Sequence, residues 1–128
     1  MEKAWKISDS EWLVLRCLWK KSPLRIKEIT AMLKEETGWN SNMVRAMIVR
    51  LQEKEAIGVE RTGHSYGYYP IADEAACVKQ ETESFLDRVF ERSVSKLFVT
   101  LADNRRISDQ ELEELEELIR RLKAEEEK

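Results

Sequence analysis

The sequence lacks any uninterrupted apolar run long enough to cross a membrane. The richest stretch, residues 12–19, is interrupted by Arg16, whereas a spanning helix needs about 18 to 20 consecutive apolar residues. The first nine residues also lack the apolar core and the small-residue cleavage site of a secretory signal. We therefore expect no membrane insertion and a cytoplasmic location.

Cysteine and histidine are too scarce to favour a metal centre. Only Cys17, Cys77 and His64 are present. The two cysteines are far apart in the sequence and lie in apolar surroundings, which favours two buried, reduced thiols over a disulfide or a metal pair. We predict no metal and no cofactor.

Catalytic motifs are missing as well. The sequence contains no glycine-rich phosphate loop and no serine–histidine arrangement with local support. Carboxylates are abundant in residues 111–117, but their helical spacing places them on the solvated side of an amphipathic helix. We therefore predict that the chain is not an enzyme.

Charge divides the chain into two halves of opposite sign. Residues 1–71 contain 12 Lys and Arg against 9 Asp and Glu, a net charge of +3, whereas residues 72–128 contain 10 against 16, a net charge of −6. A basic first half suits contact with phosphates, and an acidic second half is repelled by them.

The first half has the pattern of a helix-turn-helix. Ser8 and Glu11 have capping-box spacing and predict a helix over about residues 9–20. A second helix is expected over about residues 26–37, ended by Gly38. Ser41 is expected to cap a third helix that runs to about Glu55, and so short a connection is typical of a helix-turn-helix.

A β-hairpin is expected after the third helix. Residues 57–61 and 66–71 have strand composition, and residues 62–65 suit a tight turn. The predicted fold class is mainly α with a small β-hairpin wing. It comprises an N-terminal winged helix-turn-helix DNA-binding domain (residues 1–71) and a C-terminal three-helix dimerisation region (residues 72–128).

The second half is predicted to be helical throughout, with a break near Ser93 and a second capping box at Ser108 and Glu111. About 55 residues are too few to bury its apolar stripes alone, so a homodimer is expected. An intramolecular helical hairpin packed on the first half is the alternative. The expected dimerisation residues are Phe85, Val89, Phe90, Leu97, Phe98, Leu101, Leu112, Leu115, Ile119 and Leu122.

The third helix is the expected reader of double-stranded DNA. A rotation of about 100° per residue places Val44, Met47, Ile48 and Leu51 inward. The opposite face then combines a polar amide with small apolar side chains and flanking arginines, which suits base edges, thymine methyl groups and phosphates. The predicted contacts on this helix are Ser41, Asn42, Met43, Arg45, Ala46, Val49, Arg50 and Lys54.

The wing is expected to add contacts to the sugar-phosphate backbone or to a narrow minor groove. It supplies a cation, hydroxyl groups and an aromatic ring close to the turn, from Arg61, His64, Ser65 and Tyr66.

These residues resemble the penicillinase-repressor (BlaI/MecI) family of bacterial transcriptional repressors. The similarity lies in residues 7–12 with Leu18 and Trp19, in Val44–Arg45 with Arg50–Leu51, and in residues 66–70 of the wing. It implies a homodimeric repressor that binds a dyad operator and regulates antibiotic resistance. Met43 and Ala46 stand where the family usually has threonines, so we expect a different operator sequence.

The same resemblance implies relief of repression by a membrane sensor-protease that cuts within the dimerisation region. The similar stretch is residues 99–102, where Thr100 replaces the expected asparagine. The implied scissile bond is Thr100–Leu101.

Two other functions are alternatives. The winged helix would serve only as a protein–protein interaction module, or a small ligand would relieve repression from a cavity lined by Phe85, Phe90 and Phe98. DNA binding that weakens steeply with salt separates a repressor from an interaction module.

Overall fold

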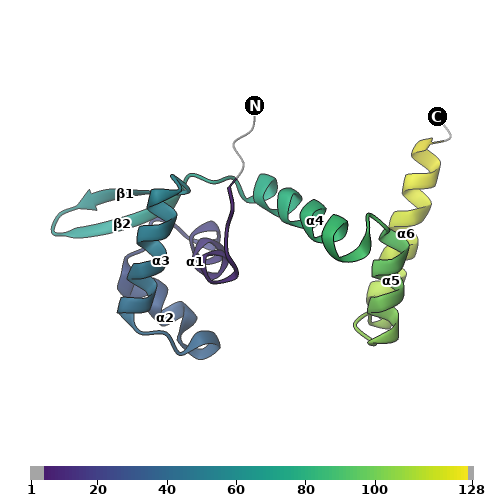
Figure 1. Ribbon diagram of the computed structural model, residues 1–128, viewed down its shortest axis with the longest axis horizontal. Coiled ribbons are helices and arrows are strands. Elements are labelled where there is room, and N and C mark those ends of the chain that lie inside the picture. Colours follow the sequence, from purple (N-terminus) through teal and green to yellow (C-terminus); the bar gives the residue numbers. More distant parts are fainter. Residues whose placement is uncertain (1–4, 127–128) are drawn as a thin grey trace. The chain divides into compact units, whose positions relative to one another are not determined.

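The computed structural model describes residues 5–126, and within them six α-helices and one two-stranded antiparallel sheet (Figure 1). This confirms the predicted mainly helical fold with a hairpin wing. The chain divides into two compact units, the first ending at Glu81 and the second beginning at Thr82. The elements are α1 (Asp9–Lys20), α2 (Ile26–Thr37), α3 (Ser41–Glu53), β1 (Ile57–Thr62), β2 (Ser65–Pro70), α4 (Glu74–Phe90), α5 (Val94–Asp103) and α6 (Asp109–Glu126).

Helix α1 begins at the expected capping box. The Ser8 hydroxyl accepts a hydrogen bond from the Glu11 N–H (3.2 Å), and the Glu11 carboxylate accepts one from the Ser8 N–H (2.9 Å). Both backbone donors, which have no partner inside the helix, are thereby satisfied. The helix buries Val14, Leu15 and Leu18 against the rest of the first unit.

The turn between α2 and α3 differs from the prediction at one residue. Gly38 ends α2 in the left-handed region (φ 71°), as expected. The cap of α3, however, is Asn40 rather than Ser41, since the Asn40 side chain accepts the Met43 N–H at 3.0 Å. Asparagine and serine are about equally good caps, so Ser41 becomes the first helical residue. The helix ends at Glu53, before the expected Glu55.

Strands β1 and β2 form the predicted wing. Thr62 pairs with Ser65, which leaves a two-residue turn whose Gly63 has φ 66°. Leu24, just before α2, pairs with Tyr68 on the other edge of β2 through hydrogen bonds of 3.0 and 2.8 Å. The wing is therefore attached to the helix-turn-helix by backbone hydrogen bonds.

The core of the first unit reaches beyond the boundary expected after residue 71. Ala72 and Cys77 are buried in that core. The Trp19 indole N–H donates to the Ala72 carbonyl (3.0 Å), and the Ala56 carbonyl accepts from the Ala72 N–H (2.9 Å). The charge changes sign near residue 71, but the packing continues into the first turns of α4.

The second unit has helices but no buried side chain among its described residues, 82–126. The break expected near Ser93 is present, because α4 ends at Phe90 and the Ser93 hydroxyl caps α5 by accepting the Lys96 N–H (3.1 Å). The second predicted capping box is also present, since the Glu111 N–H donates to the Ser108 hydroxyl (3.1 Å) and the Ser108 N–H to the Glu111 carboxylate (3.3 Å).

Both cysteines are free and buried, in agreement with the prediction. Burial raises the pKa of the Cys17 and Cys77 thiols. Of the helices described, none has the length and apolar character needed to span a membrane.

Candidate nucleic-acid interface

Helix α3 presents the face that its spacing predicts. Val44, Met47, Ile48 and Leu51 are buried in the core of the first unit. The opposite face is exposed and mixes polar and apolar side chains, with Met43 44% and Val49 46% exposed. The exposed residues of the predicted set are Ser41, Asn42, Met43, Arg45, Ala46, Val49 and Arg50.

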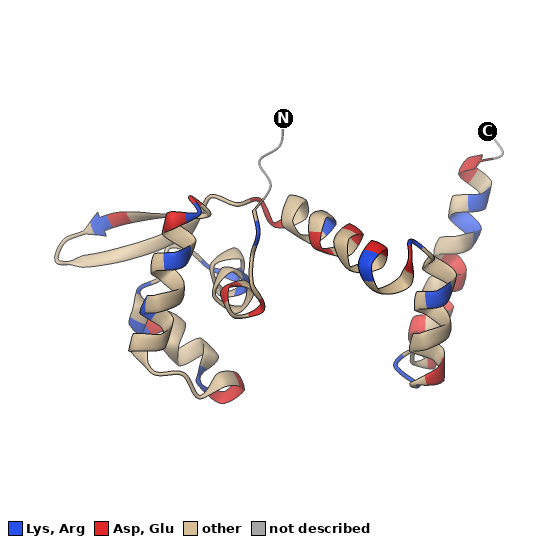
Figure 2. Cartoon of the chain, viewed as in Figure 1, with Lys and Arg blue, Asp and Glu red and all other residues tan. Residues whose placement is uncertain are grey.

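The charge on this face is positive. Arg45 and Arg50 are the basic residues of α3, and its acidic residue, Glu53, lies in the last turn (Figure 2). Asn42 and Arg45 are about one helical turn apart, and the Arg45 guanidinium donates a long hydrogen bond (3.4 Å) to the Asn42 side-chain oxygen. The surface therefore offers hydrogen-bond donors beside small apolar groups.

The tip of the wing carries a second set of predicted residues. Arg61 and Tyr66 are cross-strand partners, and the guanidinium carbon lies 5.8 Å from the centre of the tyrosine ring. Arg61 also donates to the Gly63 carbonyl (3.2 Å), while Tyr66 is 53% exposed. His64 is exposed and Ser65 is half-buried. The cation–π contact holds the ring and the guanidinium together at the tip.

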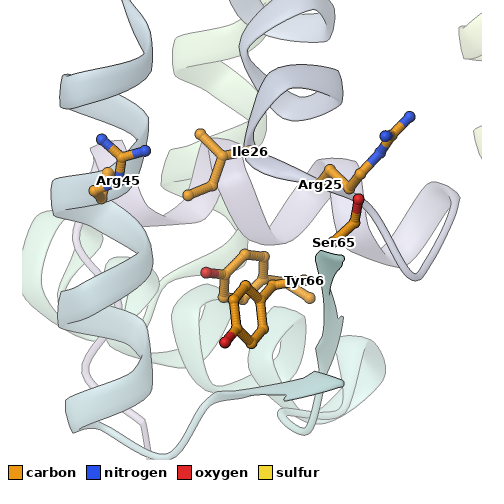
Figure 3. Close-up of a pocket in the computed structure, with 6 residues that line it drawn as sticks. Arg25, Ile26, Arg45, Ser65 and Tyr66 are labelled. Atoms are coloured by element: carbon orange, nitrogen blue, oxygen red, sulfur yellow. The ribbon is translucent and has the colours of Figure 1, made fainter. Parts of the chain in front are cut away.

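A concave pocket of about 300 Å³ joins α3 to the wing. Its lining comprises Arg25, Ile26, Arg45, Ser65, Tyr66 and Tyr68. Figure 3 shows Arg45 and Arg25 on either side of Ile26, with Tyr66 below it in this view. Two guanidinium groups, the Ser65 hydroxyl and two phenols thus line one pocket, which suits an anionic group.

Arg25 belongs to this pocket but was not among the predicted contacts. It lies between Leu24, which pairs with β2, and the first residue of α2. The Glu28 carboxylate accepts hydrogen bonds from the Arg25 N–H (3.0 Å) and from its guanidinium Nε (3.2 Å). These bonds, the backbone one first, lower the pKa of Glu28. Glu28 thereby restrains both the backbone and the guanidinium group of Arg25.

Lys54 stands apart from the other predicted contacts. Its ammonium donates to the Glu11 carboxylate (2.5 Å) and to the Lys6 carbonyl, and its side chain is only 34% exposed. The cation is therefore engaged inside the first unit, and we leave it out of the candidate interface.

The partner of Lys54 is the buried carboxylate of Glu11, which also belongs to the capping box of α1. Glu11 is 1% exposed. Its burial alone would raise its pKa, but hydrogen bonds from Lys54 and Ser8 outweigh that effect and hold the pKa below its usual value. Glu11 is therefore charged at neutral pH.

The predicted dimerisation residues lie on the helices from residue 82 onward with their apolar groups accessible. Six are exposed, the largest fractions being those of Leu122 (52%), Val89 (50%) and Ile119 (50%). The half-buried members are Phe90, Leu97, Leu101 and Leu115. Phe85 and Phe90 pack edge to face with ring centres 5.6 Å apart.

Further apolar groups accompany them. Val94, Val99 and Leu118 are 53%, 59% and 40% exposed on the same helices. An isolated unit rarely exposes so many large apolar groups.

The described part of the chain has no cluster of metal-binding side chains. Residues 5–126 contain no group of three or more histidine, cysteine, aspartate or glutamate side chains placed to hold a metal ion.

Comparison with known proteins identifies the family. The model of the penicillinase repressor family matches residues 7–121. The penicillinase repressor of Bacillus licheniformis is 27% identical over 119 residues, 93% of each chain. The methicillin resistance regulatory protein MecI of Mammaliicoccus sciuri is 23% identical over 117 residues, 91% of this chain and 95% of that protein.

A solved structure agrees with these relatives. It is the solution structure of the monomeric form of Bacillus licheniformis BlaI in complex with the blaP half-operator. It is 31% identical to this chain, covers 59% of this chain and 92% of that one, and has a TM-score of 0.52. The predicted resemblance is confirmed, as is the prediction that the chain is a regulator rather than an enzyme. The chain belongs to the penicillinase repressor family.

Proposed function

We propose that this protein is a dimeric transcriptional repressor that binds a dyad operator in double-stranded DNA through α3 and the wing. The observation that carries the proposal is the exposed face of α3, where Asn42, Arg45 and Arg50 surround Ala46 and Val49. Solvated helix faces are usually filled with Glu and Lys, so this composition favours a surface that meets a partner.

The chemistry of that face fits the major groove. An asparagine can bond adenine in a bidentate manner, arginines reach guanine or phosphate, and small apolar groups contact the thymine methyl. With α3 in the groove, the pocket between Arg25, Arg45 and Tyr66 would receive a backbone phosphate. The B. licheniformis BlaI complex supports this assignment, because that protein is in complex with a half-operator and the match covers 59% of this chain.

The second unit favours an assembly of two chains. None of its described side chains is fully buried, so a second copy would cover the exposed apolar groups of α5 and α6. Closed twofold dimers are the commonest solution, and a twofold axis would place two copies of α3 about 34 Å apart or a multiple of that distance.

DNA binding is tested by fluorescence-anisotropy titration. A duplex from the region upstream of the protein's own gene is compared with a shuffled duplex of equal length. We expect the native duplex to bind more tightly, Asn42→Ala to reduce that preference, and Arg50→Ala to weaken binding to both duplexes. Binding that is absent, or equal for both duplexes, would refute the operator-binding proposal and favour a protein-interaction module.

The dimer is tested by sedimentation. The proposed dimer seam of α6 is the row formed by Leu112, Leu115, Ile119 and Leu122. Leu115→Lys places a charge in this seam and should lower the apparent mass. Gln110→Lys, at an exposed position of the same helix, adds the same charge outside the seam and should leave the mass unchanged. A monomeric wild type, or equal masses for all three proteins, would contradict the dimer.

Relief by proteolysis is the remaining part of the proposal. Thr100 and Leu101 lie inside α5, and the Thr100 hydroxyl donates to the Lys96 carbonyl (2.9 Å). A protease must therefore open this helix locally before it cuts. Incubation with the cognate membrane sensor-protease should give a fragment that begins at Leu101 by mass spectrometry, and an intact chain under inducing conditions would remove this step.

A further inference from the structure

We infer that the Glu11–Lys54 ion pair positions α3 for DNA recognition without touching DNA. The inference rests on the proposed function, since it concerns the orientation of the proposed recognition helix. It begins from a connection between two helix ends. Lys54 is the residue that follows α3, and Glu11 lies in the first turn of α1.

The contacts of the pair join three segments. One oxygen of Glu11 accepts the Ser8 N–H (2.9 Å) and the Lys54 ammonium (2.5 Å). The same ammonium donates to the Lys6 carbonyl. The backbone N–H of Lys54 continues the helix by donating to the Arg50 carbonyl (3.2 Å). The last turn of α3 is thus tied both to the start of α1 and to the segment before it.

Stability alone is a poor explanation of this pair. Removing a carboxylate and an ammonium from water is costly, and apolar pairs of similar volume are often as stable or more so. The second oxygen of Glu11 is also buried without a hydrogen-bond partner among residues 5–126, which adds a further cost. A charged hydrogen bond does, however, fix distance and direction.

Apolar packing alone fixes the helix less strictly. Val44, Ile48 and Leu51 bury one side of α3, but contacts of this kind are non-directional. Val49 and Arg50 lie about one turn before Lys54 and face outward. Because base readout needs supporting residues that hold the reading groups within about 0.5 Å, an anchor at this end sets how those side chains meet the groove.

The decisive variant is Glu11→Gln. Glutamine keeps an acceptor for the Ser8 N–H and leaves the Lys54 cation in place. Because position 11 is 1% exposed, its effect on DNA must pass through the fold. We expect the folded protein, monitored by circular dichroism, to bind its operator duplex about 2- to 30-fold more weakly. The dependence of log affinity on log salt should be unchanged. Unchanged affinity would overturn the inference.

A second variant separates positioning from phosphate contact. Glu11→Gln combined with Lys54→Met removes both charges and fills the site with a side chain of similar length. If Lys54 only positions α3, affinity falls while the salt slope stays at the wild-type value. If Lys54 contacts a phosphate, the slope falls by about 0.9 per chain, which would refute the inference.

A conservative variant provides the control. Lys54→Arg keeps the charge and presents N–H groups to both oxygens of Glu11, so it should retain affinity within about threefold. A loss equal to that of the neutral double variant would also refute positioning by this pair. Failure of the proposed function is distinguishable, because the wild type itself would then show no preference for the operator.

Discussion

The salt dependence of DNA binding can be calculated from the cations that the candidate interface exposes. Arg25 and Arg45 line the pocket, Arg50 lies on the exposed face of α3, and Arg61 lies at the tip of the wing. Each phosphate contact contributes about 0.9 to the slope of log affinity against log salt. If all of them contact phosphates, the slope is about −3.6 for one unit and about −7.2 for a dimer on two half-sites.

Removing one of these cations has a defined effect. Arg50→Ala takes one phosphate contact from each half-site, so the dimer slope should change from about −7.2 to about −5.4. A threefold rise in salt would then weaken wild-type binding by roughly 2,700-fold and the variant by roughly 400-fold. The variant is thus weaker at low salt and loses proportionally less as salt increases.

The assay is an anisotropy titration at several potassium chloride concentrations, with one operator duplex and matched protein concentrations. Lys79→Ala is the control, since Lys79 is exposed beside Asp73 and Glu74, which repel DNA. The control should keep the wild-type slope. An unchanged slope for Arg50→Ala, or an equal change in Lys79→Ala, would refute the assignment of Arg50 to the backbone.

Three further predictions concern the fold. Gly38→Ala should lower the free energy of unfolding by about 1 kcal/mol in urea titrations, because φ is 71° but nothing lies within 4 Å of an added Cβ; no loss would contradict a left-handed cap. Cys17 and Cys77, with their raised pKa values, should react with a disulfide reagent slowly when folded and rapidly in urea; equal rates would contradict their burial. Glu11 has a lowered pKa, so its stabilising contribution is present above its unfolded pKa and disappears as pH falls through the folded value. The stability difference between wild type and Glu11→Gln should therefore shrink in acid, and a constant difference would count against the pair.

Local patterns were sufficient for much of this structure. Helical spacing identified the exposed face of α3, and the Ser8 and Ser108 capping boxes fixed two helix starts. The cap of α3 was wrong by one residue because Asn40 and Ser41 are both good caps, and sequence reasoning rarely separates such neighbours.

Long-range pairing explains what sequence reasoning missed. Arg25 reaches the pocket because Leu24 pairs with Tyr68, a contact between distant residues. The domain boundary was placed at a change of charge, although burial of Ala72 and Cys77 decides where the first core ends. Glu11 did leave a signal, since it shares the helical face of Val14, Leu15 and Leu18, but its partner Lys54 is distant in sequence.

The contrast between the two units connects dimerisation to DNA affinity. The first unit has its own core, whereas the described residues from 82 to 126 bury none of their side chains. If a second copy supplies that burial, the stability of the second unit depends on protein concentration, while the first unit remains folded in either state. Two linked DNA-binding units bind a dyad operator far more tightly than one, because binding of the second half-site becomes intramolecular. A cut or opening in α5 would then lower operator affinity by separating the two DNA-binding units, without altering a single residue that faces DNA.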